Sequence, residues 1–432
     1  MQLLTQRPRG TIDVLPADSH RWHHVESAVH RVCADFGFAE IRTPLFEHAE
    51  LYLRSTGETS DILEKETYTF EDRGGRELTL RPEGTPGAVR AFLENGLHNA
   101  ALPAKMYYLG PMFRYDRPQA GRYRQHVQFG VELFGAAGPE ADLEVIMTAV
   151  TFFRRLGLSQ LAVHLNSIGC PACRPGYREA LLAHYRAAAG DLCPTCRHRM
   201  ERNPLRLLDC KEPGCRPLKE TAPSAAAYLC SECDEHFAAL RGLLTRFGLD
   251  YQIDPLLVRG LDYYTKTVFE LIHTGLGGAG GTVCGGGRYD GLMAAMGGPS
   301  LPGVGFGLGM ERAMLALEKE GITTPPGRGV EVFLASVPAG DATVAEALRA
   351  RVLELLYALR DAGIAAEADL LGRSLPKQLR YASRRGAGLV VVVGPDELAA
   401  NQAKLRVMAS GEEQVVGLEE LVERARAALV GA

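Results

Sequence analysis

The chain has 432 residues, of which 46% are apolar and 23% charged; this excludes disordered and fibrous classes and allows roughly two to four packed domains. The 48 Lys and Arg residues against 52 Asp and Glu residues give a net charge of -4, so any contact with nucleic acid requires a local basic patch. The longest aliphatic run, Leu389–Val393, is far shorter than the ~20 residues of a membrane span, and Met1–Gly10 carries polar and Arg residues where a secretory signal would be apolar. We therefore expect a cytoplasmic protein without a membrane partner.

The first predicted element is an amphipathic helix over Ala17–Phe36, because apolar residues recur there at steps of three to four. Gly37 ends it before a short strand at Phe38–Ile41. Later strands, separated by Gly, Pro and Asp turns, are predicted at Thr67–Phe70, Glu77–Leu80, Met106–Leu109, Val127–Phe134, Thr267–Ile272 and Val304–Leu308. Helices are predicted at Thr85–Glu94, Pro139–Leu156 and Met310–Glu320. This order predicts a largely antiparallel sheet with helices, an α+β fold.

Two stretches interrupt that domain. Residues 166–250 carry most of the cysteines and several helical runs, so we predict a helical insertion between core segments 1–165 and 251–320. Residues 321–329, with two prolines and three glycines, have the composition of a linker. Beyond it, residues 330–432 alternate strand and helix, which predicts a separate α/β domain with a mostly parallel sheet. Its elements are predicted at Val330–Ser336, Ala342–Asp361, Ala365–Ala368, Ser374–Arg384, Leu389–Val393, Lys404–Met408 and Leu418–Leu429.

A glycine-rich stretch, Gly275–Gly287, formally matches the dinucleotide-binding pattern G-x-G-x-x-G. That motif requires a helix at its last glycine and an acidic residue about 20 positions further on, and neither follows here. We interpret the stretch as a loop in which backbones or a ligand approach closely.

The segment Tyr108–Phe134 holds the clearest candidate site. Four arginines, Arg114, Arg117, Arg122 and Arg124, crowd an apparent hairpin and are offset only by Asp116. Guanidinium groups bind phosphate oxygens through paired hydrogen bonds, although arginines on a hairpin can also be a solvated surface. Gln128 and Glu132 share one face of the following strand, where a core would prefer Val or Ile. Polar residues in phase indicate a lined cavity.

The pattern FRxxRPQxGRxRQ, with its strand ending FGVELFG, resembles motif 2 of class II aminoacyl-tRNA synthetases, specifically the histidyl-tRNA synthetases. Other segments agree in the right order along nearly the whole chain. RGTIDVLP and FAEIRTPLFE are similar to the amino-terminal and motif 1 segments of the dimer interface, LRPEGT to the loop for the amino group, VRGLDYYT and GGGRYDGL to the histidine-specific segments, and GVGFGLGMERAML to motif 3.

The resemblance implies a role for each matching residue. Glu83, with Thr85 beside it, would bind the ammonium of histidine, and Gln128 its carboxylate. Glu132 and Tyr264 would bond the two imidazole nitrogens, with Tyr289 completing the pocket. ATP would be bound, as its Mg²⁺ complex, by Arg114, Asp116, Arg122 and Arg312. Arg259 and Arg114 would stabilise charge at the α-phosphate, and Gln119 and Arg124 would contact tRNA. The family usually has Glu at the position of Asp116, so the contact to adenine could run through water.

Eight of the ten cysteines lie between Cys170 and Cys233. In a cytoplasmic chain, paired thiols are more often metal ligands than disulfides. The spacing predicts one four-thiolate zinc site from Cys170, Cys173, Cys193 and Cys196, and a second from Cys210, Cys215, Cys230 and Cys233. The alternative is a set of free thiols.

In the last domain, Arg373, Lys377, Arg380 and Arg384 fall three or four apart and predict a basic helix face. A solvated helix is the plain interpretation; the resemblance favours anticodon binding there. Taken over the whole chain, the resemblance implies a homodimeric class II histidine–tRNA ligase with L-histidine, ATP and tRNA(His) as partners. The alternative is a catalytically silent, histidine-sensing regulatory subunit of ATP phosphoribosyltransferase. Those paralogues usually lack the last domain and parts of the ATP and amino-acid loops, whereas Glu83, Arg114, Arg259 and Arg312 are all present here.

Overall fold

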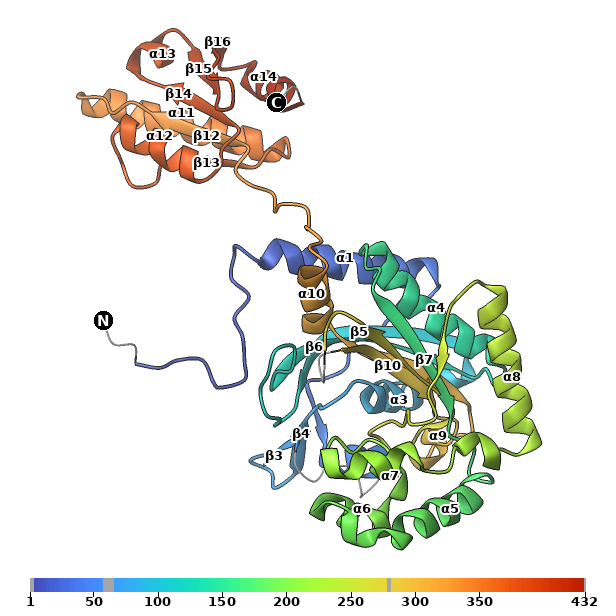
Figure 1. Cartoon of the computed structure of the whole chain (residues 1–432). Coiled ribbons are helices and arrows are strands. Elements are labelled where there is room, and N and C mark those ends of the chain that lie inside the picture. Colours follow the sequence, from blue (N-terminus) through green and yellow to red (C-terminus); the bar gives the residue numbers. More distant parts are fainter. Residues whose placement is uncertain (1–3, 57–65, 278–280, 431–432) are drawn as a thin grey trace. The chain divides into compact units, whose positions relative to one another are not determined.

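An eight-stranded sheet organises the first part of the chain in this computed structural model, which describes residues 4–56, 66–277 and 281–430 (Figure 1). The strand order is β1-β5-β6-β11-β10-β9-β7-β8, and only the edge pairs β1–β5 and β7–β8 are parallel. The strands are β1 (Ala39–Glu40), β5 (Ala104–Phe113), β6 (Gln125–Phe134), β7 (Leu161–Ser167), β8 (Gln252–Ile253), β9 (Thr265–His273), β10 (Thr282–Arg288) and β11 (Gly303–Gly309). The predicted antiparallel sheet with helices is therefore confirmed.

One face of this sheet is covered by four helices, α1 (Ser19–Asp35), α4 (Pro139–Arg155), α8 (Ser231–Arg246) and α10 (Met310–Lys319). Their apolar side chains form one core with the odd-numbered residues of β6, Phe129, Val131 and Leu133. Because side chains alternate along a strand, the even-numbered residues of β6, including the predicted Gln128 and Glu132, face the other side. The helical face therefore fixes which residues can line a site.

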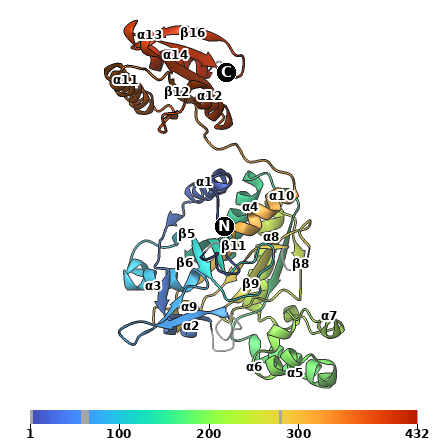
Figure 2. The ribbon, with the colours of Figure 1, turned by 90° about the vertical axis from the view of Figure 1, so that its left-hand side faces the viewer.

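A smaller antiparallel sheet of β2 (Phe46–His48), β4 (Glu77–Leu80) and β3 (Tyr68–Glu71) accompanies the large one. The helices α2 (Ala49–Thr56), α3 (Thr85–Glu94) and α9 (Leu292–Ala295) complete this part. The insertion adds α5 (Arg174–Ala187), α6 (Pro194–Arg202) and α7 (Arg216–Glu220), which gather at one end of it (Figures 1 and 2). The insertion is thus split, because α8 packs into the main core whereas α5 and α6 share a small core of their own.

The prediction of a loop at Gly275–Gly287 is wrong for its second half, which forms β10; residues 278–280 lie outside the described residues. The glycines serve close approach within the sheet. A Cβ on Gly286 would lie 2.3 Å from the carbonyl oxygen of Gly305 on β11, so a larger residue would clash with the neighbouring strand. The close approach was predicted correctly, but it occurs between strands.

The chain divides into two units, Met1–Thr324 and Pro325–Ala432. The second has a five-stranded sheet of β13 (Ala366–Ala368), β12 (Val332–Ser336), β14 (Leu389–Val393), β15 (Gln402–Val407) and β16 (Glu413–Gly417), in that spatial order. Its helices are α11 (Ala342–Asp361), α12 (Leu375–Arg384), α13 (Pro395–Ala399) and α14 (Leu421–Val430). Among the described residues of both units, no helix is long and apolar enough to span a membrane.

The prediction of a mostly parallel sheet in this unit is wrong. β12 pairs in parallel with β13 and β14, but β14–β15 and β15–β16 are antiparallel. A parallel return needs a connection of roughly a dozen residues or more, and the links at residues 394–401 and 408–412 are too short. The strand β16 was not predicted.

A buried ion pair fastens β10 to α4. Arg288 and Asp142 are both fully buried, with Arg288 Nε 3.1 Å from an Asp142 oxygen, and Arg288 also donates to the carbonyls of Ala136 and Gly138 at 3.0 Å. His236 of α8 lies 3.3 Å from the same carboxylate. Both buried charges are therefore paired and hydrogen-bonded.

We expect Arg288→Met to lower the free energy of unfolding by about 3–5 kcal/mol, because it leaves the buried Asp142 carboxylate without its arginine partner and with His236 as its remaining neighbour. Urea unfolding measures the loss. The double variant Arg288→Met/Asp142→Leu, which removes both charges, should recover a large part of it; a double variant no more stable than the single one would contradict this account.

Candidate active site

Polar side chains and glycines share the sheet face opposite the helices. Glu270 of β9, Gly285 of β10, Gly307 of β11 and Gly130 of β6 form one row across four strands. A Cβ on Gly285 would lie 2.3 Å from Arg259 Nη2, and one on Gly307 would lie 2.5 Å from Gln128 Nε2. The glycines therefore leave space above the sheet for the long side chains of their neighbours.

A cavity of about 910 Å³ lies over this row. Its lining includes the guanidinium-bearing residues Arg114, Arg122, Arg259 and Arg312. Three of them come from distant stretches of chain, the loop after β5, the segment before β9 and the start of α10. The predicted convergence of Arg114, Arg259 and Arg312 is therefore present in the structure.

Each arginine is held by a specific contact. Arg114 Nε donates to the Pro82 carbonyl at 2.8 Å, and Arg312 donates to the carbonyls of Gly121 at 3.2 Å and Thr282 at 2.5 Å. Arg259 forms an ion pair with Glu270, whose second oxygen accepts from Thr282 Oγ1 at 3.0 Å.

Positive charges crowd around Arg312. Burial, together with the positive charges of Arg122 and Arg114, lowers the pKa of Arg312. A polyanion would relieve this repulsion, so the cavity suits phosphate groups.

His126 also lines the cavity, and the sequence interpretation did not include it. Burial and the charges of Arg114 and Arg312 lower its pKa to about 3, so its imidazole is neutral at physiological pH. The alternation that identified Gln128 and Glu132 contains the signal for His126, since residues 126, 128, 130 and 132 share one face.

Asp116 and Arg122, two hairpin residues predicted to bind ATP, form an ion pair with each other. Gln119 is exposed and its backbone pairs with that of Arg122. The Arg124 guanidinium stacks over the Tyr115 ring, 3.9 Å from its centroid. These polar contacts within the hairpin hold it in place. A bound ligand would replace some of them or add to them.

Two buried carboxylates, Glu83 and Glu132, lie in a cluster of polar side chains close to the cavity. Glu132 is fully buried and accepts hydrogen bonds from Thr85 Oγ1 at 2.7 Å and from the Tyr289 hydroxyl. Glu83, which is 5% exposed, accepts from the Tyr263 hydroxyl at 3.2 Å. The other oxygen of Glu83 accepts no hydrogen bond from any described residue, so it can receive a donor from a ligand.

Tyrosine rings pack around these carboxylates. Tyr263 and Tyr264 have centroids 4.7 Å apart, and Tyr289 lies 5.6 Å from Tyr263. Gln128 Oε1 accepts from the Gly84 amide at 3.2 Å, at the rim next to the cavity. Of these groups the sequence missed Tyr263, because an aromatic residue at a strand's start is equally typical of core packing.

Both buried carboxylates have a raised pKa. Burial raises the pKa of Glu83 from 4.5 to about 7, although Arg114 opposes the rise. Burial raises the pKa of Glu132 from 4.5 to about 8, although the Tyr289 and Thr85 hydroxyls oppose it. A bound cation or hydrogen-bond donor would favour the charged forms.

This predicts a pH-dependent stability. The folded chain keeps the Glu132 proton that the unfolded chain releases above pH 4.5, so stability should fall as pH rises from about 4.5 to about 8. Glu132→Gln imitates the protonated form, so we expect it to stabilise the ligand-free protein by about 1–3 kcal/mol at pH 8 and to flatten the profile. Urea unfolding at pH 5 and 8.5 measures both. If the parent and the variant lose the same stability between pH 5 and 8.5, Glu132 is not the group responsible.

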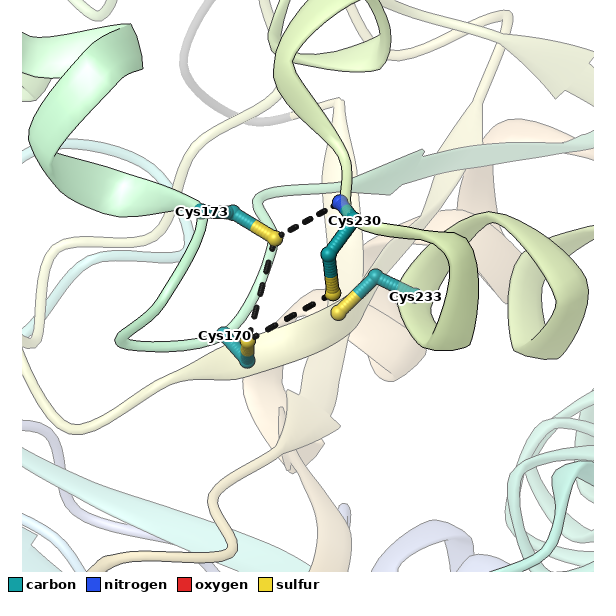
Figure 3. A group of neighbouring side chains, drawn as sticks. All are labelled: Cys170, Cys173, Cys230 and Cys233. Atoms are coloured by element: carbon teal, nitrogen blue, oxygen red, sulfur yellow. Dashed lines mark hydrogen bonds between the residues drawn. The ribbon is translucent and has the colours of Figure 1, made fainter.

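The insertion contains two groups of four thiols, Cys170/Cys173/Cys230/Cys233 and Cys193/Cys196/Cys210/Cys215 (Figure 3 shows the first). Within each group the sulfurs lie within 4.8 Å of one another. The separations Cys170–Cys173, Cys170–Cys230 and Cys193–Cys210 are 3.7, 3.9 and 3.9 Å. Four sulfurs about 2.3 Å from a central zinc ion lie about 3.8 Å apart, so the donor geometry fits tetrahedral zinc.

The predicted pairing of these cysteines is wrong. Helix α5, with 14 residues, carries the chain about 21 Å away from Cys173 before Cys193. Cys230 and Cys233, at the start of α8, return to Cys173 instead. Spacing identified the four cysteine pairs along the chain correctly, but which pairs meet depends on the helix between them.

In the second unit, Lys377, Arg380 and Arg384 of α12 are exposed. Arg373 differs, because its guanidinium stacks on Tyr381 at 4.3 Å and lies 3.5 Å from Asp369. The predicted basic face therefore consists of three exposed side chains with a fourth, half-buried one at its edge.

Known proteins resemble the chain over almost its whole length. The family model described as Histidyl-tRNA synthetase matches residues 10–313, and one described as Anticodon binding domain matches residues 331–428. The histidine–tRNA ligase of Moorella thermoacetica is 51% identical over 424 residues, 98% of each chain. That of Desulforudis audaxviator is 51% identical over 424 residues, 98% of this chain and 99% of its own. The crystal structure of apo S. aureus histidyl-tRNA synthetase, 37% identical, covers 98% of this chain and 100% of its own with a TM-score of 0.81.

Proposed function

Because the chain belongs to the histidyl-tRNA synthetase family and is an ATP-dependent histidine–tRNA ligase, we propose that its arginine-lined cavity binds ATP beside a buried histidine pocket. The convergence of Arg114, Arg259 and Arg312 on one cavity, next to two buried carboxylates, carries this proposal. ATP enters as its Mg²⁺ complex.

Histidine fits the side chains around the two buried carboxylates group by group. The free oxygen of Glu83 accepts from the ammonium, with Thr85 beside it, and Gln128 binds the carboxylate at the rim. Glu132 and Tyr264 bond the imidazole nitrogens, and Tyr289 holds Glu132 in place. Because both imidazole nitrogens have a hydrogen-bond partner, the site discriminates against amino acids of similar size whose side chains lack these nitrogens.

The first step joins histidine to the nucleotide. A carboxylate oxygen of histidine attacks the α-phosphorus, the bond from that phosphorus to the bridging oxygen breaks, and pyrophosphate leaves with the electron pair. Arg114 and Arg259 stabilise the charge on the α-phosphate, and Arg312, with Asp116 and Arg122 nearby, holds the rest of ATP. In the second step the terminal ribose hydroxyl of tRNA(His) attacks the acyl carbon, the bond from this carbon to the phosphate oxygen breaks, AMP leaves with the electron pair, and the hydroxyl proton is released.

The tRNA contacts divide between the units. Gln119 and Arg124 on the hairpin would meet the acceptor end, and the basic face of α12, with Lys377, Arg380, Arg384 and Arg373, would meet the anticodon arm. A homodimer is proposed because the segments similar to the family's interface leave apolar side chains exposed, Leu15 by 58% and Phe46 by 51%. With these partners we propose a cytoplasmic location.

Each group of four thiols is proposed to hold a structural zinc ion, since the insertion's own core is small. Metal analysis of the purified chain tests this directly. Zinc-free protein with reduced thiols would contradict it.

Histidine-dependent exchange of labelled pyrophosphate into ATP tests the first step, and charging of purified tRNA(His) tests the second. The absence of exchange in folded protein at adequate Mg²⁺ would overturn the site assignment. The regulatory-subunit alternative is not favoured, because the ligases resemble the full length of the chain. Co-purification with a phosphoribosyltransferase, without charging, would restore it.

A further inference from the structure

The insertion supplies the second wall of the nucleotide cavity. This wall, called the insertion wall below, consists of Asp209, Cys210, Lys211, Glu212, Pro213, Arg216, Lys219 and Glu220. It lies across the same cavity as Arg114, Arg259 and Arg312. Cys210 is at once part of the wall and a member of the second thiol group.

The insertion wall has little regular structure to hold it. It contains a three-residue turn at Pro213–Cys215 and the five-residue helix α7. The core behind it has ten fully buried apolar residues among those described, and three of them are the thiols Cys196, Cys210 and Cys215. Because thiols make up much of this core, a metal ion that they bind would determine the position of the insertion wall.

The same core also leads to the arginine side of the cavity. Leu256 and Val258 pack against it, directly before Arg259. Arg206, at the edge of this core, donates to the Arg259 carbonyl at 3.4 Å. The second thiol group therefore supports both the insertion wall and the segment that carries Arg259.

The first thiol group makes a natural comparison. Cys170 and Cys173 follow β7, and Cys230 and Cys233 begin α8, so this group joins the two ends of the insertion. Within the described part of the chain, none of its four cysteines lines the nucleotide cavity. The two thiol groups thus have the same four donors, but only the second contributes a residue to the lining of the nucleotide cavity.

One wall cation is available for a ligand. Arg216 pairs with Glu220 at 2.8 Å, and Lys219 donates to the Cys210 carbonyl at 3.2 Å. Lys211 is exposed and, among the described residues, makes no hydrogen bond or ion pair. A lysine next to a cysteine of the second thiol group, in the same cavity lining as Arg114 and Arg312, is placed to bind a polyphosphate.

We propose that a metal ion bound by Cys193, Cys196, Cys210 and Cys215 fixes the insertion wall, and that Lys211 on this wall binds the triphosphate of ATP. Metal occupancy of this group then controls the affinity for ATP. Histidine affinity depends on it much less, because the side chains that hydrogen-bond to the Glu83 and Glu132 carboxylates, Thr85, Tyr108, Tyr263 and Tyr289, lie outside the insertion. The inference rests on the ATP and zinc sites proposed above.

The test compares Cys210→Ser with Cys230→Ser in the full chain. Zinc is counted by mass spectrometry, and calorimetry measures binding of MgATP without histidine, and of histidine without ATP. Each variant should lose the zinc of its own group. Cys210→Ser should weaken MgATP binding by about tenfold or more and change histidine binding by less than about twofold. Cys230→Ser should change both by less than about threefold.

A second pair of variants keeps the test independent of folding. Lys211→Ala retains both thiol groups and should weaken MgATP binding by about tenfold with the zinc content unchanged. Arg186→Ala is the matched control, since Arg186 is an exposed cation of α5 outside the cavity lining. It should have no effect on MgATP.

Several results would overturn the inference. These are unchanged MgATP binding in Lys211→Ala, zinc loss without weaker MgATP binding in Cys210→Ser, an equal loss in Cys230→Ser, or no zinc in the parent. A Lys211→Ala variant that binds MgATP normally but needs more tRNA would assign the wall to the tRNA end instead. The measurements involve no turnover, so a parent that binds MgATP and zinc but fails in pyrophosphate exchange would refute only the proposed function.

Discussion

Arg259→Gln is expected to lower the rate of histidine-dependent pyrophosphate exchange by roughly 10³-fold, the largest effect of any single substitution proposed. The Arg259 guanidinium lies in the cavity above Gly285, where the missing side chain leaves room for it. Charge increases on the α-phosphate oxygens during attack, so a fixed cation there stabilises the transition state more than bound ATP. The loss should therefore appear in kcat, with a smaller change in the KM for ATP.

A control separates catalysis from the ion pair with Glu270. Removing Arg259 alone leaves the Glu270 carboxylate uncompensated and close to the incoming phosphates. In Arg259→Gln/Glu270→Gln this repulsion is absent. If the arginine itself stabilises the reaction, the double variant should stay roughly 10²-fold or more below the parent. A double variant with near-parental exchange would show that Arg259 only neutralises Glu270.

The main features of the site follow from local sequence patterns. Gln128 and Glu132 share a strand face because side chains alternate, and the elements Glu77–Leu80 and Thr85–Glu94 have the predicted bounds. The arginines needed the family resemblance, because no periodicity relates the loop of Arg114 to α10 and Arg312. Their meeting in one cavity is a property of the sheet order, in which β6 lies next to β11.

Other features depend on distances that no spacing encodes. Glu270 partners Arg259 because β9 returns beside the segment before it, and Tyr263 reaches Glu83 across 180 residues of sequence. The cysteine pairs meet according to the length and direction of α5. The insertion wall was missed for the same reason, since Lys211 lies next to the arginines only once the insertion folds over the sheet face.

Glu83→Gln is expected to lower kcat/KM for histidine by roughly 10²–10³-fold, because it leaves the buried ammonium without a charged partner. The residue is suited to this test, since one of its oxygens accepts no hydrogen bond from the described residues and the other accepts only from Tyr263. Tyr263→Phe is the matched control. It removes the tyrosine hydroxyl but keeps the carboxylate, so its effect should be smaller, about tenfold.

A ligand without the amino group decides whether Glu83 acts on the ammonium. The parent should bind histidine far more tightly than imidazolepropionate, and Glu83→Gln should lose most of this preference by weakening histidine alone. The preference in the parent should grow as pH rises through about 7, because a protonated Glu83 cannot attract the ammonium. The ratio cancels the titration of Glu132, which both ligands meet. The ammonium of histidine lowers the pKa of its imidazole below that of imidazolepropionate, so each affinity is first corrected for the fraction of free ligand with a neutral imidazole. If both ligands weaken equally in Glu83→Gln, the carboxylate holds the pocket's shape and does not recognise the substrate.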